Sequence, residues 1–212
     1  MAAVLTAGGK VCHAADTLDR VVASVGNVAI TASDVEQEYR LERFLNAQWP
    51  PPPANSVALS DAREHLTYQV LLTREENPGP TEKAESEKSA AERLAALRAE
   101  YAMAGSFQRA LQDLGMTEAE LLARIAQQEL LLRLIDQRLR PEASPSDDAV
   151  ADYYRSTFVP EYQKKNGGAT APPLSEVDGQ IREVLTQKRI NELLDRWVEE
   201  LKPMTSVRFH SF

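Results

Sequence analysis

Histidine and cysteine side chains are the usual components of metal sites and nucleophilic centres, and this sequence contains few of them. Its three histidines are His13, His65 and His210, and its single cysteine is Cys12. No two histidines have the i, i+4 spacing of a helical metal pair, and one cysteine cannot supply several thiolates. His65 lies in a polar helical stretch, where a surface or partly packed position is expected. The sequence therefore predicts neither a metal site nor a cofactor.

Paired acids and a pair of glycines are the remaining candidates for chemistry. Glu75-Glu76 and Asp147-Asp148 could be imagined as catalytic pairs. Adjacent residues on a helix point in different directions, however, so solvated charge is the better interpretation. The stretch "NGGA" at residues 166–169 lacks the preceding strand and the following Lys-Ser/Thr of a phosphate-binding loop. The sequence contains no catalytic constellation, and we do not expect an enzyme.

The charge balance restricts the possible partners. The chain has 212 residues, with 24 Lys and Arg against 32 Asp and Glu, so its net charge is −8. This acidity, without a basic stripe, does not favour a phosphate backbone, and no nucleic acid partner is expected. No run is long and apolar enough to cross a bilayer, so no stable membrane insertion is expected.

The N-terminal segment, residues 1–17, differs in character from the rest of the chain. A weak apolar run leads to small residues around Ala14 and Ala15, before an acidic, polar start. This is typical of the end of a secretory signal, although a frayed N-terminus is equally compatible with these residues. The first interpretation predicts a periplasmic or otherwise exported protein.

A short hairpin followed by a helix is the clearest local pattern. Two β-prone runs, residues 21–25 and 28–30, flank Gly26-Asn27, a two-residue loop that accepts positive φ. Ser33, with Glu36 three residues later, predicts a capping box at the start of a helix. That helix must end before the four prolines at residues 50–53.

Helical patterns dominate the remainder of the chain. A second capping box is predicted where Thr117 precedes Glu120 by three residues. The helix that begins at Ser146 is expected to be interrupted at Pro160. The expected helical segments are residues 60–76, 81–105, 106–115, 117–140, 146–159 and 175–201.

The C-terminal residues 206–210, "SVRFH", alternate apolar and polar side chains like a short strand. An isolated two-stranded hairpin is marginal in water, so the N-terminal hairpin needs a further strand or a packed helix. We therefore expect the C-terminal strand to pair with it, joining both ends of the chain. The predicted fold class is mainly α, with a small sheet formed by the N-terminal hairpin and the C-terminal strand.

Three stretches carry a resemblance to a known family. "DRVVASVGNVAITASDVEQEYRLERFL" resembles the opening of SurA-type periplasmic chaperones, which are related to the PrsA foldases. "GMTEAELLARIAQQELLLRLIDQRL" and the final helix with its strand are similar to later parts of that family's chaperone domain. The resemblance implies a single multi-helix chaperone domain over residues 18–212, with an N-terminal part, 18–140, and a returning part, 146–212.

One departure from the family affects the expected activity. Many relatives insert a parvulin-type prolyl isomerase domain before the final helix, whereas this chain has only "QKKNGGATAPP" there. The resemblance therefore implies an ATP-independent holdase for unfolded secreted or outer-membrane proteins, without isomerase activity. The alternatives are a structural or assembly protein that acts as a swapped homodimer, and a vestigial peptidyl-prolyl isomerase.

Client binding would use large apolar residues near helix ends and loops. For each of them, ordinary core packing is the competing interpretation. The candidates are Trp49, Tyr68, Leu72, Phe107, Leu111, Leu114 and Met116.

Overall fold

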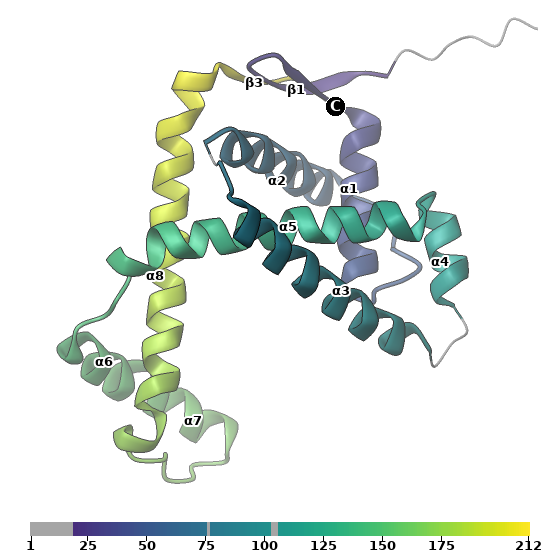
Figure 1. The fold of residues 1–212 in the computed structure, drawn as a ribbon. Helices are drawn as coiled ribbons and strands as arrows, with labels where there is room; N and C mark the ends of the chain where they lie inside the picture. Colours follow the sequence, from purple (N-terminus) through teal and green to yellow (C-terminus); the bar gives the residue numbers. More distant parts are fainter. Residues whose placement is uncertain (1–18, 76, 103–105) are drawn as a thin grey trace, which may run out of the picture.

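The computed structural model describes residues 19–75, 77–102 and 106–212. The predicted leader, residues 1–17, lies outside these ranges. The fold is mainly α with one small sheet, as predicted (Figure 1).

The sheet joins the two ends of the described chain. β1 (Val21–Val25) pairs antiparallel with β2 (Val28–Thr31) and, along its other edge, with β3 (Val207–Phe209). The strand order is β2-β1-β3, which confirms the predicted pairing of the C-terminal strand with the hairpin. The hairpin turns at Gly26, whose φ of 60° lies in the region that favours glycine.

Helix α1 (Ala32–Leu45) follows β2 directly, but its N-cap is not the predicted one. The capping box is formed by Thr31 and Asp34, each accepting a hydrogen bond from the other's backbone N–H. Ser33 instead lies in the first turn and hydrogen-bonds the Asp19 carboxylate through its hydroxyl and backbone N–H. Thr31 is the last residue with extended backbone, and its hydroxyl already caps the helix. The helix therefore begins at Ala32, two residues earlier than a Ser33 cap predicts.

Several helix boundaries also differ from the predicted ones. The second helix begins near Asn55, whose side-chain oxygen accepts from the backbone N–H of Ala58, rather than at Ser60. The capping box of Thr117 and Glu120 is present as predicted. The helices of this part are α2 (Ser56–Glu75), α3 (Pro80–Ala102), α4 (Phe107–Leu114) and α5 (Glu118–Leu139), followed by a 3₁₀ turn, Arg140–Glu142.

The predicted interruption at Pro160 is wrong, and the final helix extends beyond its predicted end at residue 201. α6 (Asp147–Tyr153) continues through a π-helical turn (Tyr154–Phe158) into α7 (Val159–Lys165), so the path stays helical past Pro160. The π turn widens the helix immediately before Pro160, where the proline lacks an N–H donor. α8 (Leu174–Thr205) likewise runs past Pro203 and ends at Ser206, whose φ is 57°.

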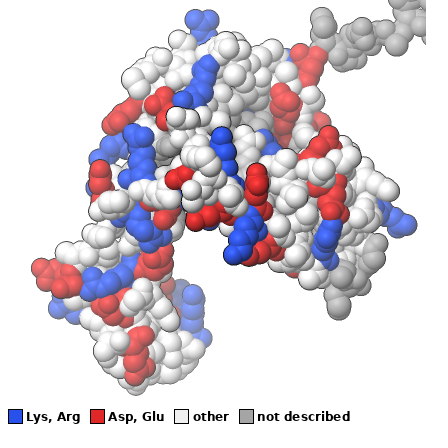
Figure 2. Space-filling model, in the orientation of Figure 1, with Lys and Arg blue, Asp and Glu red and all other residues white. Residues whose placement is uncertain are grey.

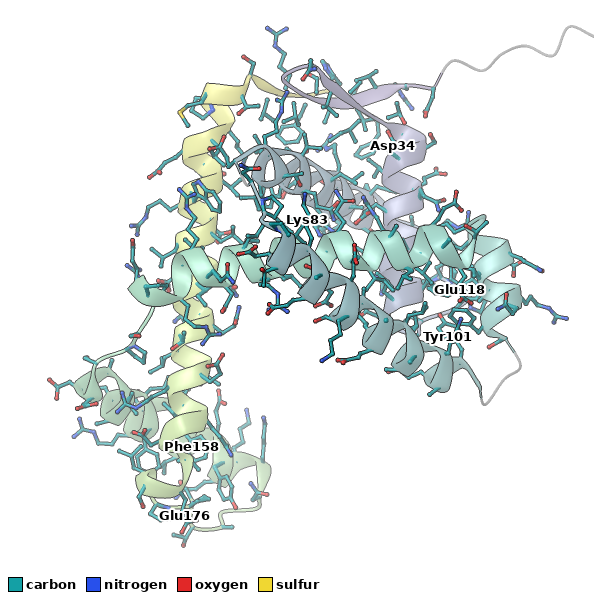
Figure 3. All side chains as sticks on the ribbon, viewed as in Figure 1. Asp34, Lys83, Tyr101, Glu118, Phe158 and Glu176 are labelled. Carbon is teal, nitrogen blue, oxygen red and sulfur yellow. The ribbon has the colours of Figure 1, made fainter. Side chains whose placement is uncertain are left out.

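Buried apolar residues form three clusters. The sheet, α2, the start of α1, the C-terminal end of α5 and the second half of α8 share the first, while α3, α4 and parts of α1 and α5 share the second. The third, around Val150, Val177 and Ile181, belongs to residues 144–185, which we call the distal lobe. The remainder is the main body, and α8 runs from the distal lobe to the sheet (Figure 1). Phe158 lies within this lobe, whereas Tyr101 lies near the end of α3 (Figure 3).

Candidate functional site

An apolar groove in the main body is the best candidate for a binding site. It has a volume of about 380 Å³ and lies mainly between α2 and α5, so we call it the α2–α5 groove. Both helices present one face at i, i+3, i+4 and i+7 spacing: residues 65, 68, 69 and 72 from α2, and 128, 131, 132 and 135 from α5. Its apolar lining is Leu45, Tyr68, Leu72, Leu131, Leu132, Ile135 and Leu194, and its polar lining is Glu42, Asn46, His65, Gln69, Arg93 and Gln128.

Leu132 is the most exposed apolar side chain of this groove. It is 61% exposed, whereas the neighbouring Leu130, Leu131 and Leu134 are partly buried. Burying such a side chain against a ligand would gain about 1.5–3 kcal/mol relative to leaving it in water. The groove can therefore bind apolar side chains through surface that the folded chain leaves exposed.

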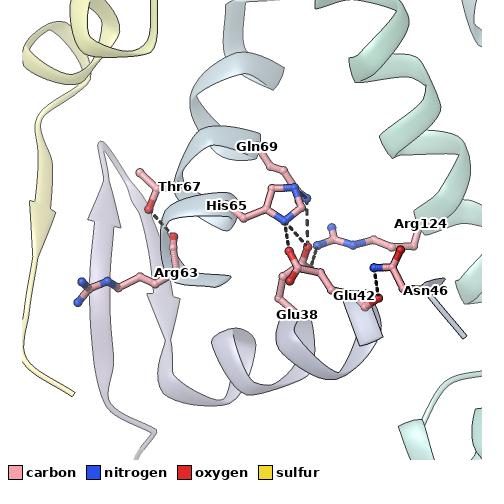
Figure 4. A network of polar contacts seen from close by, with 8 residues as sticks. All are labelled: Glu38, Glu42, Asn46, Arg63, His65, Thr67, Gln69 and Arg124. Carbon is pink, nitrogen blue, oxygen red and sulfur yellow. Dashed lines mark hydrogen bonds and ion pairs between the residues drawn. The ribbon is translucent and has the colours of Figure 1, made fainter. Parts of the chain in front are cut away.

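A polar cluster of side chains from α1, α2 and α5 borders the groove (Figure 4). Glu38 is only 2% exposed, and its carboxylate accepts hydrogen bonds from Arg124 at 2.6 Å and from Gln69 at 3.2 Å. His65 Nδ1 lies 2.6 Å from Glu42 Oε1 and 3.2 Å from Glu38 Oε1. The buried carboxylate is thus paired on several sides, as a charge removed from water requires.

His65 is held in this cluster by carboxylates. The hydrogen bond that His65 donates to the Glu42 carboxylate raises the pKa of His65, and the negative charge of Glu38 adds to this, whereas partial burial acts against it. His65 Nε2 also lies 3.1 Å from the Gln69 side-chain amide nitrogen. Both ring nitrogens therefore have partners, so the ring orientation is fixed by α1 and α2 together.

A second cavity is lined by other residues of the polar cluster. It has a volume of about 470 Å³, and Glu38, Arg124, β2 and the loop before α5 contribute to its lining. Met116 contributes to its lining. The Glu38–Arg124 ion pair thus lines the second cavity but not the α2–α5 groove, and both cavities combine large apolar with polar side chains.

The predicted client-binding residues do not form one surface. Tyr68 and Leu72 line the α2–α5 groove, although Leu72 is only 2% exposed and belongs to the first core cluster, and Met116 lines the second cavity. Phe107, Leu111 and Leu114 are buried in the second core cluster, and Trp49 packs against that cluster. In this conformation these last four residues contribute to packing, which is the competing interpretation that the sequence left open.

Sequence reasoning did not identify the groove residues of α5 or the polar cluster. The apolar residues of α5 cover more than one stripe, and that excess was the signal for a second, partly exposed face. The Glu38–Glu42 pair has i, i+4 spacing and could have been noticed as a carboxylate pair on one helix face. No spacing rule, however, connects that pair to His65 on another helix.

Charges of both signs are mixed over the face shown in Figure 2, without a broad basic area there. Among the described residues, no helix combines the length and apolar character needed to span a membrane. No family model, curated protein or solved structure matches the chain. The SurA-type family assignment and the homodimer therefore remain predictions.

Proposed function

We propose that this protein is an ATP-independent chaperone of the cell envelope that holds unfolded secreted or outer-membrane polypeptides in the α2–α5 groove. The observation that carries the proposal is the apolar lining of this groove, with Leu132 exposed on its α5 side. The family resemblance and the leader-like N-terminus support the compartment and the type of client.

The chemistry of the groove suits a client without a fixed sequence. Apolar burial is non-directional and follows the area removed from water, so a leucine-lined groove accepts many apolar side chains. Polar groups at the border, among them Gln128 and Arg93, remain available to hydrogen-bond the backbone or polar side chains of an extended client. We therefore propose a non-catalytic holdase.

Suppression of aggregation tests this proposal. The full chain should prevent an unfolded outer-membrane protein from aggregating at a near-stoichiometric ratio, and Leu132→Ser should weaken that effect. Loss of one apolar contact of about 1.5 kcal/mol corresponds to about a tenfold weaker affinity for the client. Because Leu132 is largely exposed, the substitution should change the stability of the chaperone by less than about 0.5 kcal/mol.

Val57→Ser and Val184→Ser are matched controls. These valines are 65% and 51% exposed, so they resemble Leu132 in exposure, but neither lines the groove. Both variants should suppress aggregation as well as the unmodified chain does. Equal loss in all three variants would point to general surface hydrophobicity, and failure of the unmodified chain would overturn the holdase proposal.

A further inference from the structure

The polar cluster beside the groove has the composition of a metal site. Within the described residues, Glu38, Glu42 and His65 form the one set of three side chains whose potential ligand atoms converge, all within 4.8 Å of one another. Glu38 and Glu42 come from successive turns of α1, and His65 comes from the facing side of α2 (Figure 4). Two rigid helices therefore position the three ligand atoms.

The distance from His65 to Glu38 is close to the one that a metal ion requires, whereas the distance from His65 to Glu42 would have to lengthen by about 0.7 Å. With metal–nitrogen and metal–oxygen bonds near 2.0–2.2 Å, tetrahedral ligand atoms lie roughly 3.3–3.5 Å apart. His65 Nδ1 is 3.2 Å from Glu38 Oε1 and 2.6 Å from Glu42 Oε1. Glu42 is partly exposed, so its carboxylate can move outward by the small distance that an ion would need.

The neighbouring side chains leave one oxygen of Glu38 free to bind a metal ion. Arg124 binds Oε2 of Glu38, so Oε1 remains directed at His65 and Glu42. Gln69 contacts both His65 Nε2 and Glu38 Oε1, which fixes the imidazole ring and the buried carboxylate from outside the site. A metal-bound histidine donates its other ring N–H to an outer acceptor, so with a metal on Nδ1 the Gln69 amide would turn its oxygen towards His65 Nε2.

We propose that Glu38, Glu42 and His65 bind a divalent transition-metal ion of the zinc class, with a fourth position open towards the α2–α5 groove. Glu42 and His65 line that groove, so the open position faces the space that a bound ligand would enter. Two carboxylates and one imidazole are hard and borderline ligands, which suit Zn²⁺ better than the soft Cu⁺. This site is independent of the holdase proposal, because it rests on the ligand geometry alone.

The test is a Zn²⁺ titration of the full chain without an affinity tag, in competition with a chromophoric chelator. The unmodified chain should bind one equivalent. His65→Gln and Glu42→Gln should each weaken binding by at least about tenfold, the lower range for disturbing a metal site. Both side chains are partly exposed, so these variants should fold, as circular dichroism without zinc will show.

Two controls separate this site from other zinc ligands. His210→Gln removes the other histidine of the described chain, which lies near the C-terminus, and the Cys12→Ser/His13→Gln double variant removes the N-terminal candidates. Both should bind zinc as the unmodified chain does. Co²⁺ provides a second measurement: its visible absorption should show nitrogen and oxygen ligation, without a thiolate charge-transfer band.

The possible outcomes decide the proposal. Saturable binding that depends on both His65 and Glu42, with thiolate-free Co²⁺ absorption, supports the site. It is overturned if the unmodified chain shows no saturable uptake, or if folded His65→Gln and Glu42→Gln variants keep the full affinity. If one variant does not fold, the other and the Co²⁺ spectrum decide. Loss of zinc binding with normal suppression of aggregation would leave the holdase proposal intact.

Discussion

The main body and the distal lobe are both helical, yet they differ in how much apolar surface they bury. The main body contains two clusters of buried side chains that involve the sheet and six helices. In the described part of the distal lobe, only Val150, Val177 and Ile181 are buried, and partly exposed aromatic rings surround them. Most of the burial that stabilises the protein therefore lies in the main body.

This difference in burial indicates that the distal lobe is less stable than the main body, although α8 runs through both. α8 contributes its first turns to the distal lobe and its last turns to the main body. The lobe also has ion pairs, such as Arg182 with Asp147 and Asp178, but exposed pairs contribute little. We expect the lobe, with the first turns of α8, to open at a lower free energy than the main body.

Among the variants that test this comparison, Phe44→Ala in the main body should cause the largest loss of stability. Phe44 is fully buried, and its ring stacks on Tyr101 at a centroid distance of 4.9 Å and contacts Phe107 at 5.7 Å. Removal of the ring should lower the free energy of unfolding by about 3–5 kcal/mol, because it leaves a cavity between α1, α3 and α4. Urea unfolding followed by circular dichroism measures this change.

Phe158→Ala is the matched variant in the distal lobe. Its ring also stacks on neighbours, Tyr154 at 5.8 Å and Tyr162 at 6.0 Å, but it is only partly buried. Amide exchange should rise within the distal lobe, while the main unfolding midpoint stays close to that of the unmodified chain. If both variants lower the main midpoint equally, the two regions unfold as one unit and the comparison is wrong.

The next largest effect is expected from deleting residues 205–212. The deletion removes β3, including the backbone hydrogen bond from His210 N–H to Val22 O at 2.9 Å. It also removes the Phe209 and Phe212 rings on which the Arg63 guanidinium lies. Because a two-stranded hairpin is marginal, we expect a loss of about 2–4 kcal/mol, spread over the main body.

Thermal unfolding and amide exchange together assess the deletion. The melting temperature should fall, and exchange should rise in β1, α2 and the end of α8, which share one cluster. Exchange in residues 147–165 of the distal lobe should not change. A truncated chain that melts like the full one would show that the strand is a dispensable tail.

The pairing of the terminal strand was predictable because strand patterns are rare in this chain. A hairpin around Gly26-Asn27 needed a partner, and the final residues offered the other strong candidate. The capping box at Thr117 was predictable because it depends only on a local spacing. The extension of α8 past Pro203 was not, because packing of its last turns on the sheet and α2 overrides local preference.

The candidate site was largely beyond sequence reasoning. Tyr68 and Leu72 were selected for their size, and both line the groove, although Leu72 is also buried in the first core cluster. Size alone did not separate Tyr68 from Phe107 or Leu114 in the core. Which face of α5 remains open depends on how α2 and α8 cross it, and this is a tertiary property. The convergence of His65 with α1 has the same origin.

The smallest expected effect concerns the junction between the two regions. Glu183 on α8 accepts two hydrogen bonds, at 3.0 and 3.1 Å, from Arg140 at the end of α5, and this guanidinium lowers the pKa of Glu183. A lowered pKa in the folded state means that the ion pair stabilises the junction above the unfolded pKa of about 4.3. The contribution is then lost as the pH falls through the lowered value.

Glu183→Gln should therefore destabilise the protein slightly at pH 7, and the difference from the unmodified chain should shrink in acid. Urea unfolding at both pH values measures this, and an equal difference at both would contradict an ionic role for Glu183. Because the pair is exposed, only a small change is expected, so the continuity of α8, more than this contact, should connect the lobe to the main body.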